Sequence, residues 1–394
     1  MSEWQEMTLD EAASINPRES LSAGTVAKKI SMTDLQPYTK KVITYSLEAY
    51  KGGMKFRNGD TLVARITPCL ENGKTAYVDI LEGEEIGFGS TEYIVIREKP
   101  GISDKQFLYY FLISPAFRDV AILSMTGSSG RQRVQTDVVT SHKFQLPGLP
   151  EQKAIGSVLS SLDEKIELLD RQNKTLEAMA EMLFRQRFVE EPDINWRLQN
   201  ILDVVQLVGG GTPKTSTPEY WNGEIPWLSG GDIAASHKSF AIDSESKISQ
   251  IGLENSAAKL LPKYATVISA RGTVGKYCLL AKPMAFSQSN YGILPRFDEC
   301  YFFAYLLINN VVEELQSSAY GSVFDTITTD TFKGINLPLP GENVVRGFEE
   351  EVTAIFKKML LNKEQIQTLE KIRDTLLPKL MTRELSVGYE RRGH

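Results

Sequence analysis

The sequence predicts a mixed α/β protein in which two similar globular domains are separated by an antiparallel coiled coil of two long helices. Three observations lead to this fold class. Segments of the first half recur in order in the second half, each half ends in a long heptad pattern, and each globular part mixes short strand-like runs with one apolar helix. Internal repeats and hydrophobic periodicity are direct structural signals in a single sequence.

The repeat is clearest in the apolar helix of each half. DKQFLYYFLISP at 104–115 aligns with DECYFFAYLLIN at 298–309 at an offset of 194. Chance could supply one such match, but it is a poor account of several matches in the same order. The others are Gly127-Ser128 with Gly321-Ser322, Leu146-Pro147 with Leu337-Pro338, and Trp4 with Trp196.

A looser match covers the strand-like runs. VARITPCLENGK (63–74) corresponds to ISARGTVGK (268–276), and EYIVIR (92–97) corresponds to NYGILPR (290–296). This alignment predicts that Arg65 is equivalent to Arg271 and that Lys74 is equivalent to Lys276.

Each half ends in a predicted helix, at 150–190 and 342–385, whose apolar positions alternate spacings of three and four, as in a coiled coil. Helices of about 35–40 residues would be about 50–60 Å long. Because they leave opposite halves of the chain, we expect them to pair antiparallel; the alternative is that each docks on its own domain. Asn173 and Asn362 interrupt the seam and are predicted to set its register. Pro378 makes the last turn of the second helix doubtful. The predicted seam residues are Leu159, Leu162, Ile166, Leu169, Asn173, Leu176 and Leu183, with Val352, Ile355, Met359, Asn362, Ile366, Leu369 and Leu376.

The remaining residues form the globular parts. We assign a first domain to 1–149, a second to 191–341 and a C-terminal tail to 386–394, with one apolar helix per domain near 104–119 and 298–316.

Composition excludes several classes of protein. The chain has 394 residues and a net charge of −6, and its longest apolar runs are far shorter than the ~20 residues of a membrane span. No secretory signal is present, so we expect a cytoplasmic protein. Scattered cysteines argue against disulfides and structural zinc. The histidines, at 142, 237 and 394, are too far apart for a metal motif and are interpreted as surface or locally bonded side chains.

The stretch VGGGTPKTSTPEYW (208–221) resembles a phosphate-binding loop only in composition. Pro213 occupies the place of the glycine that precedes the lysine in such loops, and it has no N–H to offer a phosphate. Pro218 then blocks the helix that should follow. No other catalytic motif is present in the sequence.

Basic residues gather in two windows that occupy matching places in the two halves. Residues 28–74 hold nine Lys or Arg against four acids, and residues 255–297 hold six against none. Locally basic windows in an acidic chain indicate contact with phosphates, so the sequence favours a nucleic-acid partner.

Three segments resemble the specificity subunits of type I restriction–modification enzymes, and the resemblance covers nearly the whole chain. GGGTPKTSTPEYWNGEIPWLSGGDI (209–233) looks like the start of a target recognition domain, ISARGTVGK (268–276) matches a second motif, and LPGLPEQKAIGSVLSSLDEKIELLDRQNKTLEAMAEMLFRQRF (146–188) resembles the central conserved region.

The resemblance implies a non-catalytic subunit that binds double-stranded DNA at a bipartite, asymmetric site. Each domain would read one half-site, and a spacer of ~50 Å would set a gap of about fifteen base pairs. Two methyltransferase subunits and restriction or translocase subunits are the implied partners, with no membrane partner. This chain would hold no cofactor, whereas its partners would use S-adenosylmethionine, and ATP with magnesium.

Most of the candidate DNA contacts fall into three groups. Arg65 with Arg271, and Lys74 with Lys276, recur in both copies and are candidates for DNA contacts or for ion pairs that support the shared fold. Arg131 and Arg133 fit base readers better, because the second copy has Phe324 and Asp325 nearby and half-sites should differ. The lysines of the first basic window are expected to be phosphate contacts or solvated. The full set is Lys28, Lys29, Lys40, Lys41, Arg65, Lys74, Arg131, Arg133, Lys214, Arg271, Lys276 and Arg296.

Three alternative functions remain open on the sequence alone. A duplicated coiled-coil scaffold would join two partners without binding DNA. A specificity subunit of a related restriction system that is not type I would share this architecture. An enzyme whose motif is not recognised would methylate adenine by itself.

Overall fold

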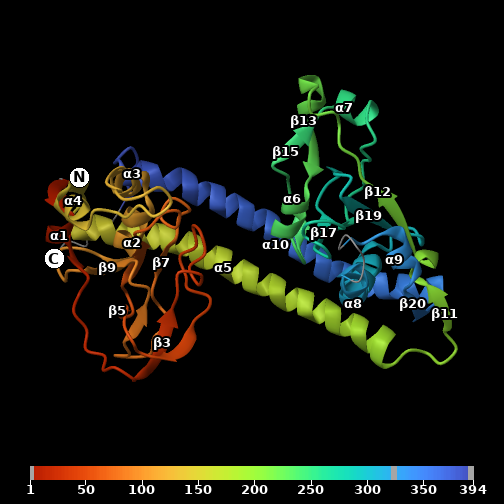
Figure 1. Cartoon of the computed structure of the whole chain (residues 1–394), viewed down its shortest axis with the longest axis horizontal. Helices are drawn as coiled ribbons and strands as arrows, with labels where there is room; N and C mark the ends of the chain where they lie inside the picture. The colour runs from red at the N-terminus through yellow and green to blue at the C-terminus, as the bar shows by residue number, and fades with distance from the viewer. Residues whose placement is uncertain (1–3, 321–325, 389–394) are drawn as a thin grey trace. The chain divides into compact units, whose positions relative to one another are not determined.

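A computed structural model of the chain describes residues 4–320 and 326–388. The chain divides into two compact units, Met1–Glu167 with Thr368–His394, and Leu168–Gln367. Each unit contains one globular domain together with a segment of each of the two long helices, α5 (Leu149–Arg185) and α10 (Glu342–Met381) (Figure 1).

The first unit is built on two four-stranded sheets and a two-stranded one. Their strand orders are β2-β9-β6-β7, β4-β3-β8-β5 and β1-β10. The strands are β1 (Gln5–Thr8), β2 (Ala13–Ile15), β3 (Val26–Ile30), β4 (Ser46–Ala49), β5 (Met54–Phe56), β6 (Thr61–Ala64), β7 (Thr75–Tyr77), β8 (Gly87–Gly89), β9 (Tyr93–Glu98) and β10 (Lys143–Leu146). The helices are α1 (Leu9–Ala12), α2 (Lys105–Ile113), α3 (Pro115–Leu123) and α4 (Thr136–Ser141).

The second unit has the same plan, with one more strand in its main sheet and one fewer in its second sheet. Its strand orders are β12-β19-β16-β17-β14, β15-β13-β18 and β11-β20. The strands are β11 (Arg197–Asn200), β12 (Val205–Gly209), β13 (Trp221–Leu228), β14 (Phe240–Ala241), β15 (Ser246–Ile248), β16 (Thr266–Ser269), β17 (Tyr277–Leu280), β18 (Ala285–Phe286), β19 (Asn290–Pro295) and β20 (Asn336–Leu339). The helices are α6 (Gly230–Ala235), α7 (Gln250–Glu254), α8 (Tyr301–Tyr320) and α9 (Thr329–Lys333), with short turns η1 (Gln186–Glu190), η2 (Ile201–Asp203) and η3 (Pro218–Tyr220). In Figure 1, β13, β15 and α7 project as an arm from the rest of this unit.

The predicted duplication is confirmed strand by strand. The order β2-β9-β6-β7 recurs as β12-β19-β16-β17, with antiparallel neighbours throughout both series. In the second sheet of each unit, one pair of neighbouring strands is parallel: β3 with β8 in the first unit and β13 with β18 in the second. The short sheet β1-β10 recurs as β11-β20.

Backbone hydrogen bonds correct two details of the sequence alignment. The amide of Arg65 bonds to the carbonyl of Glu92 at 3.0 Å, and in the second unit the same bond joins Ala270 to Ser289 at 3.0 Å. Arg65 is therefore equivalent to Ala270, and the predicted pairing of Arg65 with Arg271 was wrong by one residue. The pairing of Lys74 with Lys276 is confirmed, because their carbonyls accept from Ala64 and Ser269 at corresponding places in the ladder.

The second correction concerns the Leu-Pro pair that precedes each long helix. Leu146 pairs with Gln5, and Leu339 pairs with Arg197, at the same end of the two short sheets. Leu339-Pro340 thus occupies the place of Leu146-Pro147, because LPLP offers two matches and only the second is buried at both residues.

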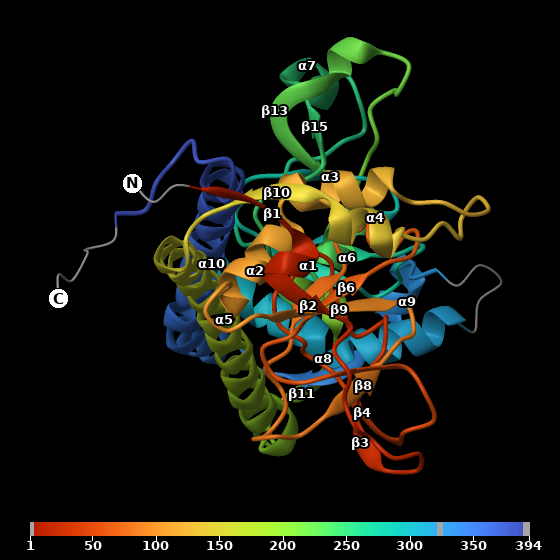
Figure 2. The same ribbon diagram turned by 90° about the vertical axis from the view of Figure 1, so that its left-hand side faces the viewer.

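The apolar helix of each domain forms the centre of its core, but the first copy is broken. Residues 107–112 of α2 are all buried, and α2 ends before Pro115, which begins α3. Proline fits the first turn of a helix but interrupts one that is already running. The single helix predicted near 104–119 is therefore two, whereas α8 is continuous. Figure 2 shows the loop between α3 and α4 extending away from the first unit.

The amino end of α8 is capped by a carboxylate from α10. Glu349 accepts hydrogen bonds from the backbone amides of Phe302 at 3.0 Å and Phe303 at 2.7 Å, and it is only 8 % exposed. A carboxylate at a helix amino terminus satisfies unpaired N–H groups and the helix dipole. Burial nevertheless raises the pKa of Glu349 from its ordinary value of 4.5 to about 7.

The two long helices pair antiparallel within each unit. In the first unit Leu159 shares a core with Leu377 and Leu380, and Arg373 bonds to Asp163 at 2.8 Å. In the second unit Arg187, in the segment η1 that directly follows α5, pairs with Glu351 of α10 at 2.9 Å. Each of the predicted seam residues is buried or half-buried. Pro378 does not stop α10, which continues to Met381.

The two predicted register residues contact each other. The Nδ2 of Asn362 donates to the Oδ1 of Asn173 at 2.9 Å, and the Nδ2 of Asn173 donates to the carbonyl of Met359 at 3.1 Å. Asn362 is fully buried, and its Oδ1 has no hydrogen-bond partner among the residues that the structure describes. A pair of amides thus occupies a position where apolar side chains would pack at lower cost.

Replacing both amides with leucine should stabilise the second unit. The Asn173→Leu/Asn362→Leu variant removes both polar partners, so its unfolding free energy should rise by roughly 1–2 kcal/mol, or a few degrees in melting temperature. Thermal unfolding of the wild type and the double variant measures this. Asn362→Leu alone should gain less, because Asn173 then loses its partner. An unchanged or lower melting temperature for the double variant would contradict the cost assigned to this pair.

The pKa of Glu349 makes the stability of the second unit depend on pH. A carboxyl group with a raised folded pKa stabilises the fold below about 4.5, and this contribution is lost as pH rises from 4.5 to about 7. Wild type should therefore lose up to about 3 kcal/mol relative to Glu349→Gln between pH 4.5 and pH 8. Denaturant unfolding at several pH values gives the difference, with Glu314→Gln, an exposed position of α8, as the control. A difference that does not change with pH would contradict the prediction.

Candidate nucleic-acid interface

In the first unit, many of the residues predicted to contact DNA bond to other residues of the same unit. Three lysines form ion pairs with N–O distances of 2.7–2.9 Å: Lys28 with Glu85, Lys29 with Glu48 and Lys41 with Glu167. Lys74 donates instead to the carbonyl of Met32 at 2.8 Å. These contacts hold the strands and loops of the domain together. Most of the cations of the first basic window are therefore bonded within the protein.

Lys40 is not placed to contact a phosphate. It is 9 % exposed, and its Nζ donates to the Oγ of Ser160 at 2.8 Å and lies over the rings of Tyr77, Tyr109 and Tyr110. Burial lowers the pKa of Lys40 to about 8. The prediction of a phosphate contact is corrected here, because the side chain connects the domain to the long helix α5.

Four of the predicted contacts make neither an ion pair nor a side-chain hydrogen bond within the described residues: Arg131, Lys214, Arg271 and Lys276. Arg131 lies at the tip of the loop between α3 and α4, and Lys214 lies in the loop after β12. Arg271 and Lys276 flank the loop between β16 and β17, where Arg271 is exposed and Lys276 is half-buried. Arg296 is also exposed, but its Nε donates to the carbonyl of Leu202 at 2.6 Å.

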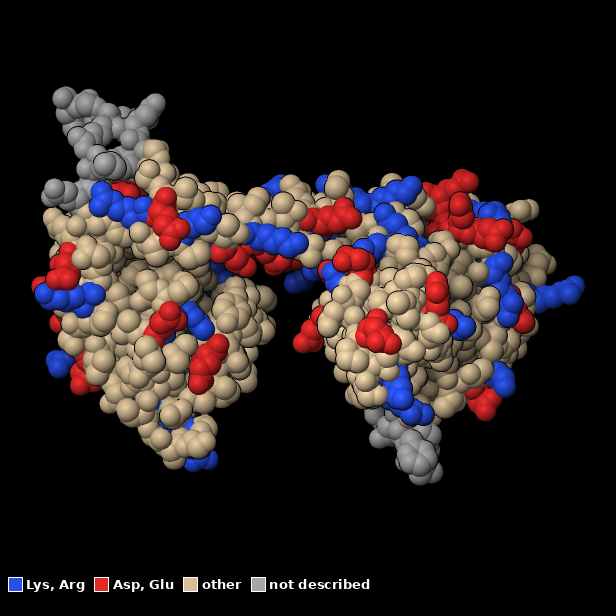
Figure 3. Space-filling model, turned by 90° about the horizontal axis from the view of Figure 1, so that it is seen from above, with Lys and Arg blue, Asp and Glu red and all other residues tan. Residues whose placement is uncertain are grey.

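Charges of both signs are interspersed on the face of each unit that Figure 3 shows. Many basic side chains on this face stand beside acidic ones.

The loop after β12 does not form a phosphate-binding loop. It leads through the single 3-10 turn η3 into β13, so no α-helix begins directly after Lys214. The carbonyl of Lys214 accepts from the indole of Trp221 at 3.3 Å, and the carbonyl of Gly211 accepts from Trp227 at 2.9 Å. Two tryptophans thus fix the backbone of the loop and leave the lysine side chain exposed.

In the first unit, two arginines that were predicted to contact DNA bond to the same carboxylate. Glu92, immediately before β9, bonds to Arg65 after β6 at 3.2 Å and to Arg133 at 2.7–3.0 Å. The two guanidinium groups lower the pKa of Glu92, the hydrogen bond from Arg133 being the largest cause. Sequence reasoning missed Glu92, because its partners lie 27 and 41 residues away along the chain.

Some sequence predictions lie outside the described residues. These are the contrast of Arg133 with Phe324 and Asp325, the match to Gly321-Ser322, and His394. Of the other histidines, His142 packs on Phe144, and His237 lies beside the backbone of Tyr277.

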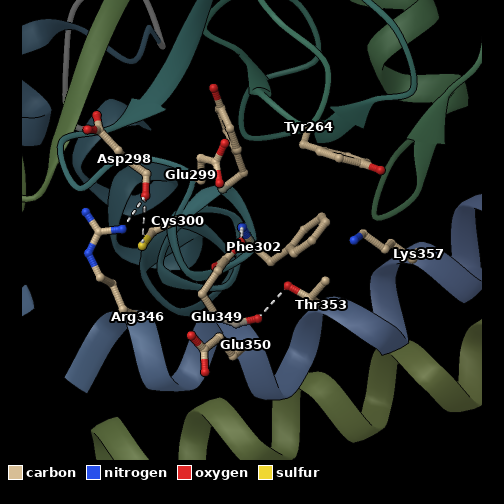
Figure 4. A pocket seen from close by; sticks show the side chains of 11 residues that line it. Tyr264, Asp298, Glu299, Cys300, Phe302, Arg346, Glu349, Glu350, Thr353 and Lys357 are labelled. Atoms are coloured by element: carbon tan, nitrogen blue, oxygen red, sulfur yellow. Dashed lines mark hydrogen bonds between the residues drawn. The ribbon is translucent and has the colours of Figure 1, made fainter. Parts of the chain in front are cut away.

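A cavity of about 430 Å³ lies in the second unit where α8 begins above α10 (Figure 4). Its lining includes Tyr264, Phe302, Cys300 and the capping carboxylate of Glu349. Burial raises the pKa of the Cys300 thiol to about 11, which disfavours the thiolate. Because Glu349 is bonded to the backbone of α8, its carboxylate in this cavity serves the helix cap.

No group of three or more His, Cys, Asp or Glu side chains that could hold a metal ion occurs within residues 4–320 and 326–388. Within the same ranges, no helix combines the length and apolar character needed to span a membrane.

Comparison with known proteins gives the same two-domain division as the repeat. The family model of the type I restriction modification DNA specificity domain matches residues 1–178 and again residues 193–371. The specificity subunit of the type I restriction enzyme HindI from Haemophilus influenzae is 24 % identical over 406 residues, covering 84 % of this chain and 87 % of the relative. The MjaIX specificity subunit from Methanocaldococcus jannaschii is 24 % identical over 303 residues, covering 72 % and 69 %.

A solved structure shares the fold. The S subunit of a type I restriction–modification system from M. genitalium superimposes with a TM-score of 0.60 at 17 % identity, covering 96 % of both chains. The family model matches most of the chain, in two copies that coincide with the duplicated sheets. The protein therefore belongs to the specificity subunits of type I restriction–modification systems, the non-catalytic, DNA-recognising component, and carries two DNA specificity domains in tandem.

Proposed function

We propose that this chain recognises a bipartite, asymmetric DNA site, with one half-site per domain and a gap set by the long helices. The observation that carries this proposal is a repeated scaffold with different residues at its strand ends. The same ladder positions hold Arg65 and Glu92 in the first domain but Ala270 and Ser289 in the second. Two domains with one backbone geometry and different polar side chains would read different bases.

We also propose that the long helices recruit methyltransferase subunits. In the second unit, α5 uses one seam to pair with α10, yet a second line of apolar side chains stays exposed. Leu168 is 40 % exposed, Met179 48 % and Met182 69 %, and their spacings of eleven and three place them on one helical face. Exposed methionines on a helix suit docking of another helix, because their side chains adapt to a partner surface.

The family resemblance implies a division of chemistry, which is part of this proposal. This chain would supply DNA recognition and hold no cofactor, the methyltransferase subunits would use S-adenosylmethionine, and restriction or translocase subunits would use ATP with magnesium. The named relatives are specificity subunits, which supports this division of roles.

Methylome sequencing tests the recognition of DNA. A methylation-free host would express this chain with its cognate methyltransferase subunit, and the methyltransferase alone would be the control. A split motif with methylated adenine should appear only when this chain is present. A stable complex of the two proteins that produces no motif would instead favour a scaffold without DNA recognition, and methylation by this chain alone would indicate an enzyme.

The exposed helix face gives a separate prediction. Met179→Asp/Met182→Asp should weaken binding of the methyltransferase subunit at least tenfold, because two carboxylates would be buried in an apolar contact. Isothermal titration of the purified proteins measures the affinity. The matched control is Lys174→Asp, which adds negative charge to an exposed position on another face of α5. Equal affinities for wild type and the methionine variant would contradict docking at this face.

A further inference from the structure

The first domain contains a cluster of Arg65, Glu92 and Arg133, which we call the arginine clamp. Arg133 is held side-on by Glu92: its Nε lies 3.0 Å from both carboxylate oxygens, and its Nη2 lies 2.7 Å from Oε1. Arg65 reaches the same carboxylate through its Nε at 3.2 Å. The side chains of Arg133 and Arg65 remain 44 % and 35 % exposed, so the clamp is open to a ligand from outside the domain.

The bonds to Glu92 leave the outer edge of Arg133 available. A guanidinium has five N–H donors in one plane, and Glu92 takes the donor on Nε and one donor on Nη2. One donor on Nη2 and two on Nη1 then point away from the carboxylate. Two parallel N–H groups on one edge of an arginine match O6 and N7 of guanine in the major groove.

Backbone hydrogen bonds hold both arginines in place. The segment of Arg133 pairs with Thr126 across its own loop at 2.8 and 3.0 Å, and with the segment of Arg65 through the bonds of Val134 to Arg65 and of Thr67 to Gln132, both at 2.9 Å. Gly127, with φ of 131°, sits where a side chain would approach the carbonyl of Arg131. The clamp is therefore placed before any ligand arrives, which limits the entropy cost of binding.

The second domain has no such clamp at the same backbone positions. The bond of Val134 to Arg65 corresponds to that of Ile327 to Ala270, so Arg133 corresponds to Thr326. With Ala270 for Arg65 and Ser289 for Glu92, the second domain replaces all three charged side chains by small neutral ones. A charged cluster required by the shared scaffold would recur in both copies, so the difference points to recognition.

The chemistry of the clamp favours a base over a phosphate. A phosphate would lie beside the Glu92 carboxylate and be repelled by it, whereas a guanine edge is neutral and offers acceptors only. Glu92 cannot itself read cytosine without giving up an arginine, because both of its oxygens are occupied. The carboxylate instead orients the two guanidinium groups.

We propose that Arg65 and Arg133 read guanine in the half-site of the first domain, and that Glu92 is the positioning residue that aims them. This inference rests on the proposed function, since it requires that the first domain reads DNA. It assigns specificity at one guanine position or at two adjacent ones.

The test is methylome sequencing of variants with the cognate methyltransferase subunit in a methylation-free host. Arg133→Ala and Arg65→Ala each remove one reader, Arg133→Lys keeps the charge but loses the paired donors, and Glu92→Gln frees both arginines. The matched controls are Lys143→Ala, an exposed ion-paired residue of the same domain, and Arg271→Ala in the second domain.

We expect Arg133→Ala and Arg133→Lys to lose roughly tenfold to a hundredfold of the discrimination for guanine at one position of one half-site. Glu92→Gln should relax the same position, and the other half-site should stay unchanged in all variants of the clamp. Lys143→Ala should leave the motif intact, and any change from Arg271→Ala should fall in the other half-site.

Three outcomes would overturn the proposal. The motif could stay unchanged in every clamp variant, methylation could fall uniformly across sites with the same motif, or the relaxed position could lie in the half-site that Arg271→Ala alters. A uniform fall would indicate a phosphate contact or a structural role, which DNA-binding measurements at graded salt would separate, since a lost phosphate contact lowers the salt slope by about one. If the wild-type chain produces no motif, the proposed function itself fails; if wild type produces one, the variants decide this inference alone.

Discussion

Each domain of this protein depends on one packing constraint, the burial of its apolar helix on two sides. In the first unit α2 shares a core with strands β6 and β9 and with Leu159 and Leu377 of the long helices. In the second unit α8 packs rings against the long helices, where Phe303 contacts Phe184 and Phe302 stacks on Phe356. Aromatic side chains bury large apolar areas, so a domain that tilted on its own helix segments would expose them at high cost. Strand ends and loops are thereby held in a defined orientation to the helix segments of the same unit.

Duplication of this packing unit separates the part of the protein that must stay constant from the part that can vary. The sheets, the apolar helix and the Leu-Pro pair before each long helix recur with the same topology. Residues where β6 and β16 end do not recur, since an Arg–Glu–Arg cluster in one copy corresponds to Ala, Ser and Thr in the other. Side chains at a strand end contribute little to the core, so they can change without changing the fold, and specificity can change with them.

Polar groups buried near the long helices show a second consequence of the same packing. Lys40, Glu349 and the pair of Asn173 with Asn362 each place a polar atom where an apolar side chain would be less costly. Every one of them bonds to an element that is distant in sequence: Lys40 to α5, Glu349 to α8, and Asn173 to α10. Apolar contacts alone tolerate sliding, whereas such directional bonds are satisfied at only one register, which selects a single alignment of domain and helix.

The sequence by itself determined the features that depend on repetition and periodicity: the fold class, the duplication, the two long helices and the family resemblance. It also identified Asn173 and Asn362, because an amide on an apolar seam is visible in the heptad pattern. The tertiary structure decided the features that depend on contacts across long sequence separations. These are the equivalence of Arg65 with Ala270, the break of the apolar helix at Pro115, the burial of Lys40 and the role of Glu92. A shift of one residue or an ion pair between separate strands leaves composition and periodicity unchanged, so only the folded chain, in which backbone ladders set the register, distinguishes a free arginine from a positioned one.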